Sequence, residues 1–411
     1  MDAAPFRAVR YHPDVAGELA TTTAPSYEEV ERFAYAAHRA SSPYTVLELL
    51  SPASGFAAAS DTFRRWLRTG VLLRDPRPAF YTYEEHELRG GVPAVQRGVL
   101  AAVRLAALDD PEDLLPHEGI DTDRAAARLA RLEAVPLDVS PVFALMVGLH
   151  HDLRSLLDRA PRQPPVVAVT DEAGVDHRVW RVDDPADIAT VREGLVGATA
   201  VIADGHHRYA AALAFRDRQR ARRGLRPDAP WERTLVYLVD AHAYGPRILP
   251  IHRLVRGLDD RALRRLETDV AVTPQPGGPR DILAALEGSA GPAFGLWRQG
   301  RGAVLRPHAP DVLRSRLPAG MSGAWRDLDV AVLEHGVLPT VTTPDRVETR
   351  SDLDAATADC ATDPTAGLFL LRPVDADSVL DLARSGERMP AKATSFVPKP
   401  RTGLVMRDVD D

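Results

Sequence analysis

The residues best suited to chemistry stand together at residues 204–208, within the segment VIADGHHRY. An apolar run ends in Asp204 and Gly205, and His206, His207 and Arg208 follow directly. If a helix begins here, its first backbone N–H groups lack helical partners and lie at the positive end of the helix dipole. Gly205 then permits close approach of an anion, Arg208 can bond two of its oxygens, and the histidines add donors. The segment therefore indicates a site for an oxyanion such as phosphate.

Asp204 needs a separate explanation, because a carboxylate repels a bare phosphate. It fits the site if it binds a Mg²⁺ ion that accompanies phosphates, or if it assists at a substrate hydroxyl. A purely structural interpretation stays open, in which Asp204 caps the helix and the two histidines satisfy nearby backbone groups. Zinc is a further alternative, but adjacent histidines point in different directions and the single cysteine, Cys360, has no partner cysteine.

The elements that position these residues can be read from hydrophobic periodicity and capping residues. Residues 198–205 predict a buried strand that ends in a turn, and residues 206–223 predict the helix that leaves it. A second helix is expected after Asp121 or Thr122, either of which can cap it, so that His117 and Glu118 lie just before it. Another helix is expected within residues 26–40. The whole pattern predicts a mixed α+β fold, with an N-terminal α+β domain over 1–260 and a smaller C-terminal α+β lobe over 261–411.

The bulk properties of the chain exclude several classes of protein. It has 411 residues and a formal net charge of -7, which argues against a nucleic-acid partner. No run approaches the roughly 18 apolar residues of a membrane span, and the start MDAAPFRAVR lacks the apolar core of a signal peptide. We therefore expect a soluble, cytoplasmic protein without membrane partners, and a homo-oligomer is compatible with the sequence.

Five further residues are candidates for binding substrate, each with a structural alternative. Arg7 lies in PFRAVRY, where it could contact an anionic substrate, although a strand-edge ion pair is the simpler explanation. His252 and Arg253 follow an apolar segment in LPIHR, and either a site wall or a structural ion pair would suit them. Lys392 and Lys399 flank a Ser/Thr cluster, a pattern compatible with a phosphate or carboxylate clamp or with simple solvation.

Two of these motifs carry a resemblance to a known superfamily. VIADGHHRYAAAL resembles the ParB/sulfiredoxin signature, in which a strand, an Asp-Gly-x-x-Arg turn and a helix bind nucleotide phosphates, and HEGIDTDRAAARL is similar to its upstream acidic element. The resemblance implies a ParB/sulfiredoxin-like core at about residues 115–255. By analogy with members that phosphorylate free serine, it implies that Glu118 is the base, that Asp204 is the second acidic group and a Mg²⁺ ligand through the phosphates, and that Gly205, His206, His207, Arg208 and His117 bind the nucleotide, ATP or ADP.

At the scale of the whole chain, the sequence resembles a bacterial family known as domain of unknown function 1015. The segments that carry this resemblance, in order, are PFRAVRY, RGVLAAVRL, HEGIDTDR, SPVFAL, IADGHHRYAAAL, LPIHR and MPAKATSFVPK. Two departures stand out: Ser26 and Glu28 lie where the family reads P-P-Y-D, and KATSF stands where it reads K-S-T. These departures leave any role of Tyr27 or Thr394 open and point to a changed substrate.

Taken together, the motifs predict a small-molecule kinase that uses a nucleotide and Mg²⁺ to phosphorylate free serine or a related hydroxy amino acid. Neither a Walker A motif nor the protein-kinase signature is present, which excludes the common kinase folds. Two alternatives stay open: a ParB-like nucleotide-binding regulatory protein, and a phosphoester hydrolase that uses the same anion site.

Overall fold

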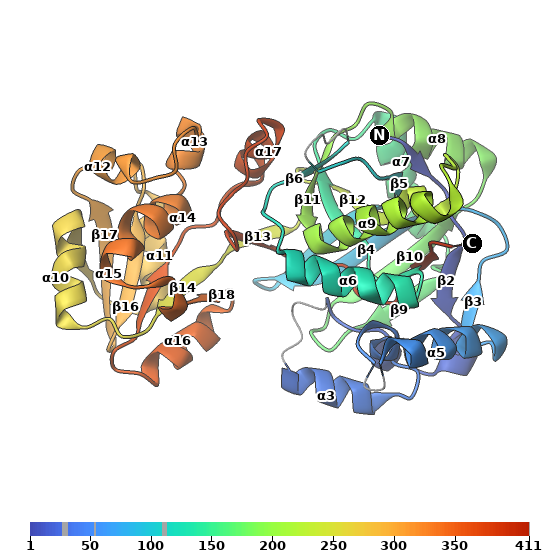
Figure 1. Ribbon diagram of the computed structural model, residues 1–411, viewed down its shortest axis with the longest axis horizontal. Helices are drawn as coiled ribbons and strands as arrows, with labels where there is room; N and C mark the ends of the chain where they lie inside the picture. Colours follow the sequence, from blue (N-terminus) through green and yellow to red (C-terminus); the bar gives the residue numbers. More distant parts are fainter. Residues whose placement is uncertain (27–31, 53–54, 109–112, 411) are drawn as a thin grey trace. The chain divides into compact units, whose positions relative to one another are not determined.

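The computed structural model describes residues 1–26, 32–52, 55–108 and 113–410, and its chain folds into two units (Figure 1). Unit 1 comprises Met1–Pro116, Ile120–Pro246 and Pro398–Asp411. Unit 2 comprises His117–Gly119 and Arg247–Val397. Each unit has sheets and helices of its own, and none of the helices in the described ranges is both long and apolar enough to cross a membrane.

Unit 1 is built on a nine-stranded mixed sheet with the order β6–β11–β8–β12–β5–β4–β10–β9, and β1 pairs with β5. The apolar run TLVYLV of β12 is buried along its length, as expected for a strand covered on both faces. The strands of this sheet are β1 (Ala3–Ala4), β4 (Phe80–Arg89), β5 (Val92–Arg104), β6 (Leu114–Pro116), β8 (Val142–Met146), β9 (Val167–Thr170), β10 (Asp176–Val182), β11 (Ala200–Asp204) and β12 (Arg233–Asp240).

Helices pack on this sheet through one apolar core. The core joins Leu156, Val191 and Leu213 of three helices to Val236 of β12. The helices of unit 1 are α1 (Pro13–Ala16), α2 (Leu19–Thr22), α3 (Arg32–Ser41), α4 (Leu47–Leu50), α5 (Phe56–Arg68), α6 (Thr122–Ala134), α7 (His151–Arg159), α8 (Pro185–Leu195) and α9 (His206–Arg223), with short 3₁₀ turns at Ala160–Arg162 and Pro230–Glu232.

The strand, turn and helix predicted around residues 198–223 are confirmed as β11 and α9, and the second predicted helix is α6. Asp121 is the N-cap of α6, because its side chain accepts hydrogen bonds from the backbone N–H groups of Asp123 (3.0 Å) and Arg124 (3.1 Å). Helices α6 and α9 lie side by side (Figure 1) and share a small apolar core that includes Leu129 and Phe215.

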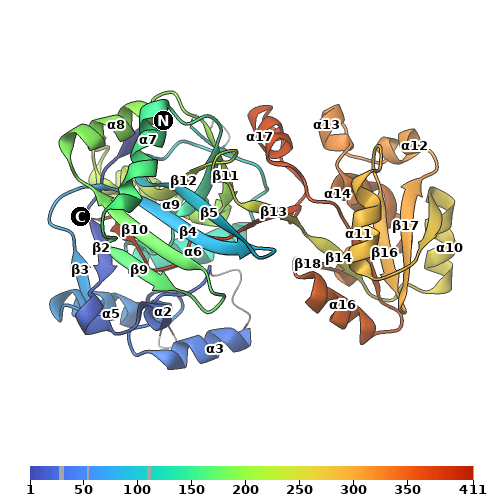
Figure 2. The ribbon, with the colours of Figure 1, turned by 180° about the vertical axis from the view of Figure 1, so that it is seen from behind.

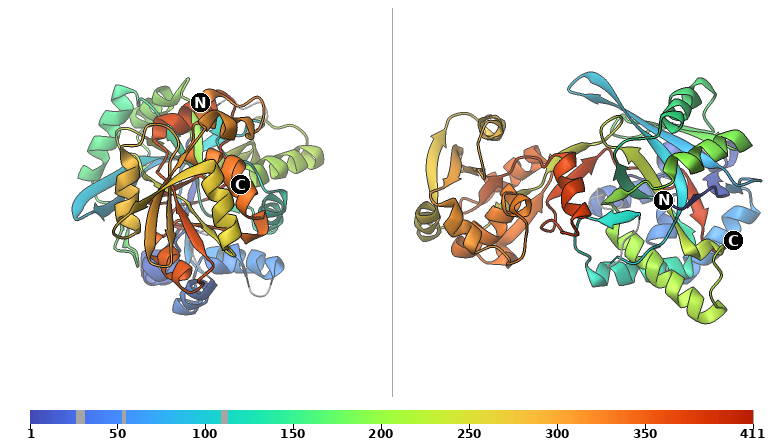
Figure 3. Two further views of the ribbon diagram at one scale, coloured as in Figure 1. Left: turned by 90° about the vertical axis from the view of Figure 1, so that its left-hand side faces the viewer. Right: turned by 90° about the horizontal axis from the view of Figure 1, so that it is seen from above.

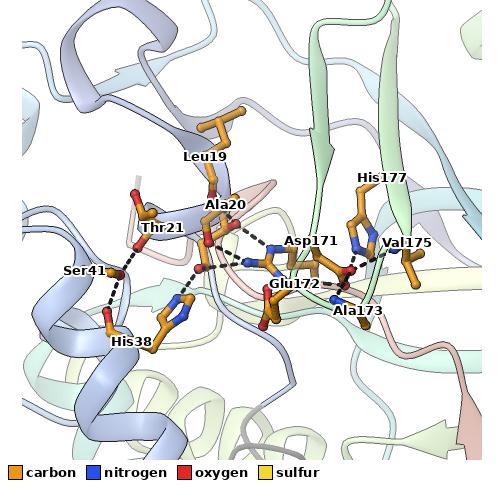
Figure 4. A network of polar contacts seen from close by, with 12 residues as sticks. Leu19, Ala20, Thr21, His38, Ser41, Asp171, Glu172, Ala173, Val175 and His177 are labelled. Carbon is orange, nitrogen blue, oxygen red and sulfur yellow. Dashed lines mark hydrogen bonds and ion pairs between the residues drawn. The ribbon is translucent and has the colours of Figure 1, made fainter.

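The C-terminal segment of the chain belongs to unit 1. It forms β21 (Met406–Asp408) in a four-stranded sheet ordered β3–β2–β21–β7, with β2 (Ala8–Tyr11), β3 (Leu72–Arg74) and β7 (Leu137–Asp138). Arg401 anchors the segment: its buried guanidinium donates to the Ala20 carbonyl (2.8 Å) and the Glu172 carboxylate (3.0 Å) and lies 3.7 Å from the Asp171 carboxylate. Figure 4 labels Ala20, Asp171 and Glu172, which come from two distant parts of the sequence.

Unit 2 contains a six-stranded antiparallel sheet ordered β15–β17–β16–β19–β14–β18, visible in Figures 2 and 3, and a separate pair, β13–β20. Its core includes Leu254, Ile282, Val304 and Leu368. Its strands are β13 (Arg247–Pro250), β14 (His252–Val255), β15 (Val270–Gln275), β16 (Phe294–Arg298), β17 (Arg301–Pro307), β18 (Val347–Arg350), β19 (Gly367–Leu370) and β20 (Thr394–Val397). Its helices are α10 (Asp260–Asp269), α11 (Pro279–Glu287), α12 (Pro310–Ser315), α13 (Gly323–Arg326), α14 (Asp329–Ala331), α15 (Leu338–Val341), α16 (Leu353–Ala361) and α17 (Ala376–Arg384), with a π-helical segment at Val332–Val337 and a 3₁₀ turn at Pro344–Arg346.

The mixed α+β fold class is confirmed, but the units differ from the expected division at residue 260. The chain enters unit 2 at Arg247 because β13 pairs with β20, and β21 returns the last residues to unit 1. Pairing between segments far apart in the sequence thus decides the division. Of the helix expected within residues 26–40, the structure shows α3, whereas Tyr27 and Glu28 lie outside the described residues.

Candidate functional site

Asp204 ends β11 and contacts two cationic side chains. It is 8% exposed, its carboxylate accepts a hydrogen bond from Arg208, one helical turn later, and its Oδ1 lies 3.2 Å from Nζ of Lys399. The predicted turn and the predicted lysine, which lie far apart in the sequence, therefore meet within unit 1. A carboxylate flanked by two cations at the start of a helix is suited to orient a polar substrate beside an anion.

The pKa of the Asp204 carboxyl is shifted by opposing effects. Burial alone raises this pKa, but the charges of Arg208 and Lys399 lower it more, so that it falls from 3.8 to about 2. Asp204 is therefore ionised at neutral pH. A carboxyl group with so low a pKa accepts a hydrogen bond from a hydroxyl group but is a weak general base. This property fits the assisting role that the resemblance implies for Asp204.

Arg208 orients the turn in this structure. Its terminal nitrogens donate to the Ser140 hydroxyl, to the Pro141 carbonyl and to Asp204. The sequence assigned Arg208 to phosphate oxygens, whereas here these nitrogens bond protein acceptors and hold the segment before β8 against the turn. Arg208 is thus a positioning residue for Asp204.

Gly205 makes this contact sterically feasible. It has φ +99°, in the left-handed region, and an added Cβ would lie 2.9 Å from Nε of Arg208. It is also the N-cap residue of α9, a position at which glycine has no side chain to bond the first N–H groups of the helix. The N-cap position of α9 thus belongs to Gly205 and not to Asp204.

Gly205→Ala is expected to lower the free energy of unfolding by about 2 kcal/mol, because left-handed backbone costs alanine roughly 1–2 kcal/mol and Arg208 must also move. Urea unfolding measures the change. Gly174→Ala is the matched control, since Gly174 has φ +80° but an added Cβ meets nothing within 4 Å. Equal losses in the two variants would contradict the steric contribution of Arg208.

The two histidines of the turn have different surroundings. His206 is buried, and it is one of the groups that lower the pKa of Asp204. His207 is half-buried, and its Nε2 accepts a hydrogen bond from the backbone N–H of Asp121 at 3.1 Å, which ties the start of α9 to the start of α6. This contact agrees with the structural interpretation of His207, although the ring also lines the pocket described next.

A pocket opens beside the turn, within unit 1. The space in it that water can reach is about 40 Å³. Apolar residues of α4 and α6 form part of its wall, and the segment 138–140 forms another part. Its charged and turn residues are Asp138, Asp204, Gly205, His207, Arg208, Arg128 and Arg131. The pocket therefore combines the predicted anion-binding turn with two arginines of α6.

His117 and Glu118 belong to unit 2, where they contact the segment 389–396. The Glu118 carboxylate accepts a hydrogen bond from the backbone N–H of Lys392 at 3.2 Å. The His117 ring is buried, lies 3.4 Å from the Thr394 hydroxyl and packs edge-on against Phe396. Two predicted site residues, Glu118 and Lys392, are thus neighbours within this unit.

Arg253 and His252 are also internal to unit 2. The Arg253 guanidinium is fully buried, pairs with Glu334 at 2.6 Å and donates to the Lys392 carbonyl at 3.1 Å. The His252 ring accepts a hydrogen bond from the Leu371 N–H at 3.2 Å, and burial followed by the charge of Arg253 lowers its pKa to about 4. These contacts agree with the structural alternative for both residues.

Arg7 is an exposed residue of unit 1 that donates to the Asp75 carbonyl at 2.9 Å, and it does not line the pocket. Ser26, Arg131 and Thr402 also line the pocket. The sequence marked Ser26 only as a departure from a family pattern, and it gave no signal for Arg131 or Thr402. Their contribution depends on packing between distant segments.

The surroundings of Asp204 do not fit the predicted magnesium ligand. Its carboxylate already bonds Arg208 and Lys399, and the described residues contain no group of three or more acidic, histidine or cysteine side chains arranged to hold a metal ion. Mg²⁺ prefers oxygen ligands and usually keeps several waters. We therefore assign no metal contact to Asp204.

Comparisons with known proteins give a family and distant structural likenesses. The model of a family described as protein of unknown function (DUF1015) matches residues 3–331. No curated protein matches the chain. A variant of a free serine kinase in complex with AMP is 14% identical, with 74% of this chain and 92% of that chain covered and a TM-score of 0.37. A conserved hypothetical protein from Pyrococcus furiosus is 14% identical, with 74% and 95% covered and a TM-score of 0.35. SbnI from Staphylococcus aureus, truncated at its C-terminus, is 13% identical, with 73% and 84% covered and a TM-score of 0.36.

Proposed function

The chain belongs to the DUF1015 family, and we propose that it is a kinase that transfers a nucleotide phosphoryl group to the hydroxyl of free serine or a related hydroxy amino acid. The observation that carries the proposal is the turn at Asp204, where an ionised carboxylate flanked by Arg208 and Lys399 meets the N-terminus of α9 beside a pocket. Phosphoryl transfer depends mainly on positioning and charge neutralisation. This set of residues supplies both.

Each residue of the turn has a role in the proposed reaction. The N-terminus of α9 and Lys399 attract the nucleotide phosphates, while Gly205 lets Arg208 pack against the turn and hold Asp204. Asp204 accepts a hydrogen bond from the substrate hydroxyl and orients its oxygen. Magnesium, with ATP or ADP, enters as part of the substrate, and no residue of the chain is assigned to it.

Glu118 is the proposed base, a role implied by the sequence resemblance. The hydroxyl oxygen bonds the terminal phosphorus, the bond from that phosphorus to the nucleotide breaks, and the hydroxyl proton passes to the Glu118 carboxylate. The backbone N–H of Lys392 bonds Oε1 of Glu118, which fixes the carboxylate. The products are a phosphomonoester and a nucleotide shortened by one phosphate.

Phosphorus NMR tests the proposal directly. The protein is incubated with Mg²⁺, ATP or ADP, and L-serine, and we expect a new phosphomonoester signal that grows with time and requires serine. Nucleotide binding without any product would favour the regulatory alternative. Release of inorganic phosphate alone would favour a hydrolase, and either result would overturn the kinase proposal.

A further inference from the structure

Lys392 has an unusual backbone conformation for a residue with a side chain. Its φ is +55°, in the left-handed region, which only Gln299 shares among the non-glycine residues that the structure describes. Gln299 and Gly300 (φ +72°) form the two-residue turn between β16 and β17, where left-handed backbone is usual. Lys392 lies between α17 and β20, so no hairpin accounts for its conformation. Contacts from other parts of unit 2 must therefore hold it.

Arg253 supplies these contacts from the six-stranded sheet. Its guanidinium is fully buried, and Nη2 donates to the carbonyl oxygens of Ala391 (3.3 Å) and Lys392 (3.1 Å). These two oxygens belong to the peptide groups on either side of Cα of Lys392. Because each peptide group is planar, binding both oxygens to one nitrogen restricts φ and ψ of Lys392.

The peptide group that joins Ala391 to Lys392 links Arg253 to Glu118. Its oxygen accepts a hydrogen bond from Arg253, and its N–H, which belongs to Lys392, donates to Oε1 of Glu118 at 3.2 Å. A hydrogen bond to the oxygen of a peptide group also polarises the group and strengthens its N–H as a donor. The direction of this N–H, and with it the orientation of the Glu118 carboxylate, thus depends on Arg253.

Other elements of unit 2 orient the guanidinium. In the sheet, β14 lies between β19 and β18, and Arg253 is paired with Phe369 and Thr349, so its backbone is held on both sides. Nε (2.7 Å) and Nη2 (2.6 Å) lie against Oε1 of Glu334, and Nη1 donates to the Ile251 carbonyl at 2.6 Å. Glu334 belongs to the π-helical segment, a type of distortion that is rare and is frequent at functional sites. All three nitrogen atoms of the guanidinium are thus fixed.

We propose that Arg253 is a positioning residue for the phosphoryl transfer. It holds the turn at Lys392 in its left-handed form and so presents a backbone N–H to Glu118, the proposed base. The inference rests on the proposed kinase function. It assigns the role of position 392 to the backbone, whereas a clamp for phosphate or carboxylate would need the Lys392 ammonium group. Substitutions at this position separate the two.

Lys392→Gly and Lys392→Val form the deciding pair. Both remove the ammonium group, but glycine adopts left-handed backbone freely, whereas a β-branched residue strongly avoids it. We expect kcat for phosphoryl transfer to be at least about tenfold lower in Lys392→Val than in Lys392→Gly, because displacing a reacting group by about 1 Å costs about 100-fold. The KM for L-serine and the dissociation constant of ADP should be the same in both variants, since neither depends on proton transfer to Glu118.

Gln299→Gly and Gln299→Val are the matched control. Gln299 is exposed, has φ +50° and has no role in the proposed reaction. Both variants should have the kcat of the wild type, although the valine variant should unfold at a lower urea concentration than the glycine variant. A loss of kcat in Gln299→Val would show that backbone strain elsewhere in unit 2 lowers activity as well, and it would overturn the inference.

Arg253→Lys tests the other end of this series of contacts. Lysine keeps the charge but lacks the planar fork that bonds Glu334 and both carbonyls together. The substitution should lower kcat at least about tenfold in the wild-type background but only about threefold or less in the Lys392→Gly background, because glycine needs less support to form the turn. Equal factors in the two backgrounds would overturn the inference. Should Arg253→Lys fail to fold, the pair at position 392 decides alone.

Amide hydrogen exchange separates failure of the inference from failure of the proposed function. The protection factor of the N–H at position 392, measured by NMR, should be at least about tenfold smaller in Lys392→Val than in Lys392→Gly, and smaller in Arg253→Lys than in the wild type. If the wild type transfers no phosphoryl group, the proposed function fails, and these protection factors still test the contact with Glu118. Equal protection in Lys392→Gly and Lys392→Val, or equal kcat values in these two variants, would overturn the inference.

Discussion

Glu118→Gln is expected to lower kcat for phosphoryl transfer by about 100- to 10,000-fold, the usual contribution of a general base, and to leave the nucleotide dissociation constant unchanged. The glutamine oxygen can still accept the hydrogen bond from the Lys392 N–H, so the local structure should persist. A glutamine side chain cannot take up the hydroxyl proton, which is the physical reason for the loss. Phosphorus NMR of the product and nucleotide titration measure the two quantities.

Asp123→Asn is the control for this change. Asp123 is an exposed carboxylate in the first turn of α6, five residues beyond Glu118, and its substitution removes the same charge. The phosphoryl-transfer activity of Asp123→Asn should equal that of the wild type. If Glu118→Gln retained full activity, Glu118 would not be the base, and the role implied by the resemblance would be wrong.

Asp204→Asn is expected to lower the free energy of unfolding by about 2 kcal/mol at neutral pH, in addition to abolishing phosphoryl transfer. The folded protein holds the pKa of Asp204 at about 2, below its ordinary 3.8, because Arg208 and Lys399 stabilise the carboxylate. Such a shift stabilises the fold by about 1.4 kcal/mol per pKa unit. Asparagine removes the negative charge at this position, so Arg208 and Lys399 lose their carboxylate partner.

The lowered pKa of Asp204 determines how its contribution to stability changes with pH. Since the folded-state pKa is the lower one, the stabilisation by Asp204 is fully present above about pH 4 and is lost as the pH falls towards 2. The stability difference between wild type and Asp204→Asn should therefore be constant near neutrality and shrink below about pH 4, as followed by urea unfolding.

Asp61→Asn, at an exposed carboxylate of α5, is the control and should cost almost nothing at neutral pH. A difference between wild type and Asp204→Asn that persisted unchanged to about pH 2 would show that the carboxylate charge is not its source. The activity of Asp204→Asn, measured in the same assay as Glu118→Gln, separates the catalytic effect from the loss of stability.

The strand, turn and helix that carry Asp204 follow from the sequence because short-range forces decide them. The apolar run of β11, the positive φ of Gly205 and the alanine-rich start of α9 each act within a few residues. The cap at Asp121 is equally local, since its side chain reaches N–H groups only two and three residues away. Residue types therefore suffice to predict which polar groups this turn presents.

Contacts between distant segments could not be predicted in the same way. Lys399 was a candidate for binding an anion, but its place beside Asp204 follows from the return of residues 398–411 to unit 1, which the pairing of β21 and the buried Arg401 secure. The acceptors of Arg208 at Ser140 and Pro141 likewise depend on how β8 packs beside β11.

The sequence by itself determined the family resemblance, the mixed α+β class and the residues of the turn, because these depend on local pattern and on motif order. Only the tertiary structure decided that Lys399 faces Asp204, that Arg208 holds the turn, and that Ser26 and Thr402 line one pocket with Arg131. The physical reason is that burial and pairing are properties of the packed chain: a polar atom is unpaired only relative to neighbours that packing brings to it from distant parts of the sequence.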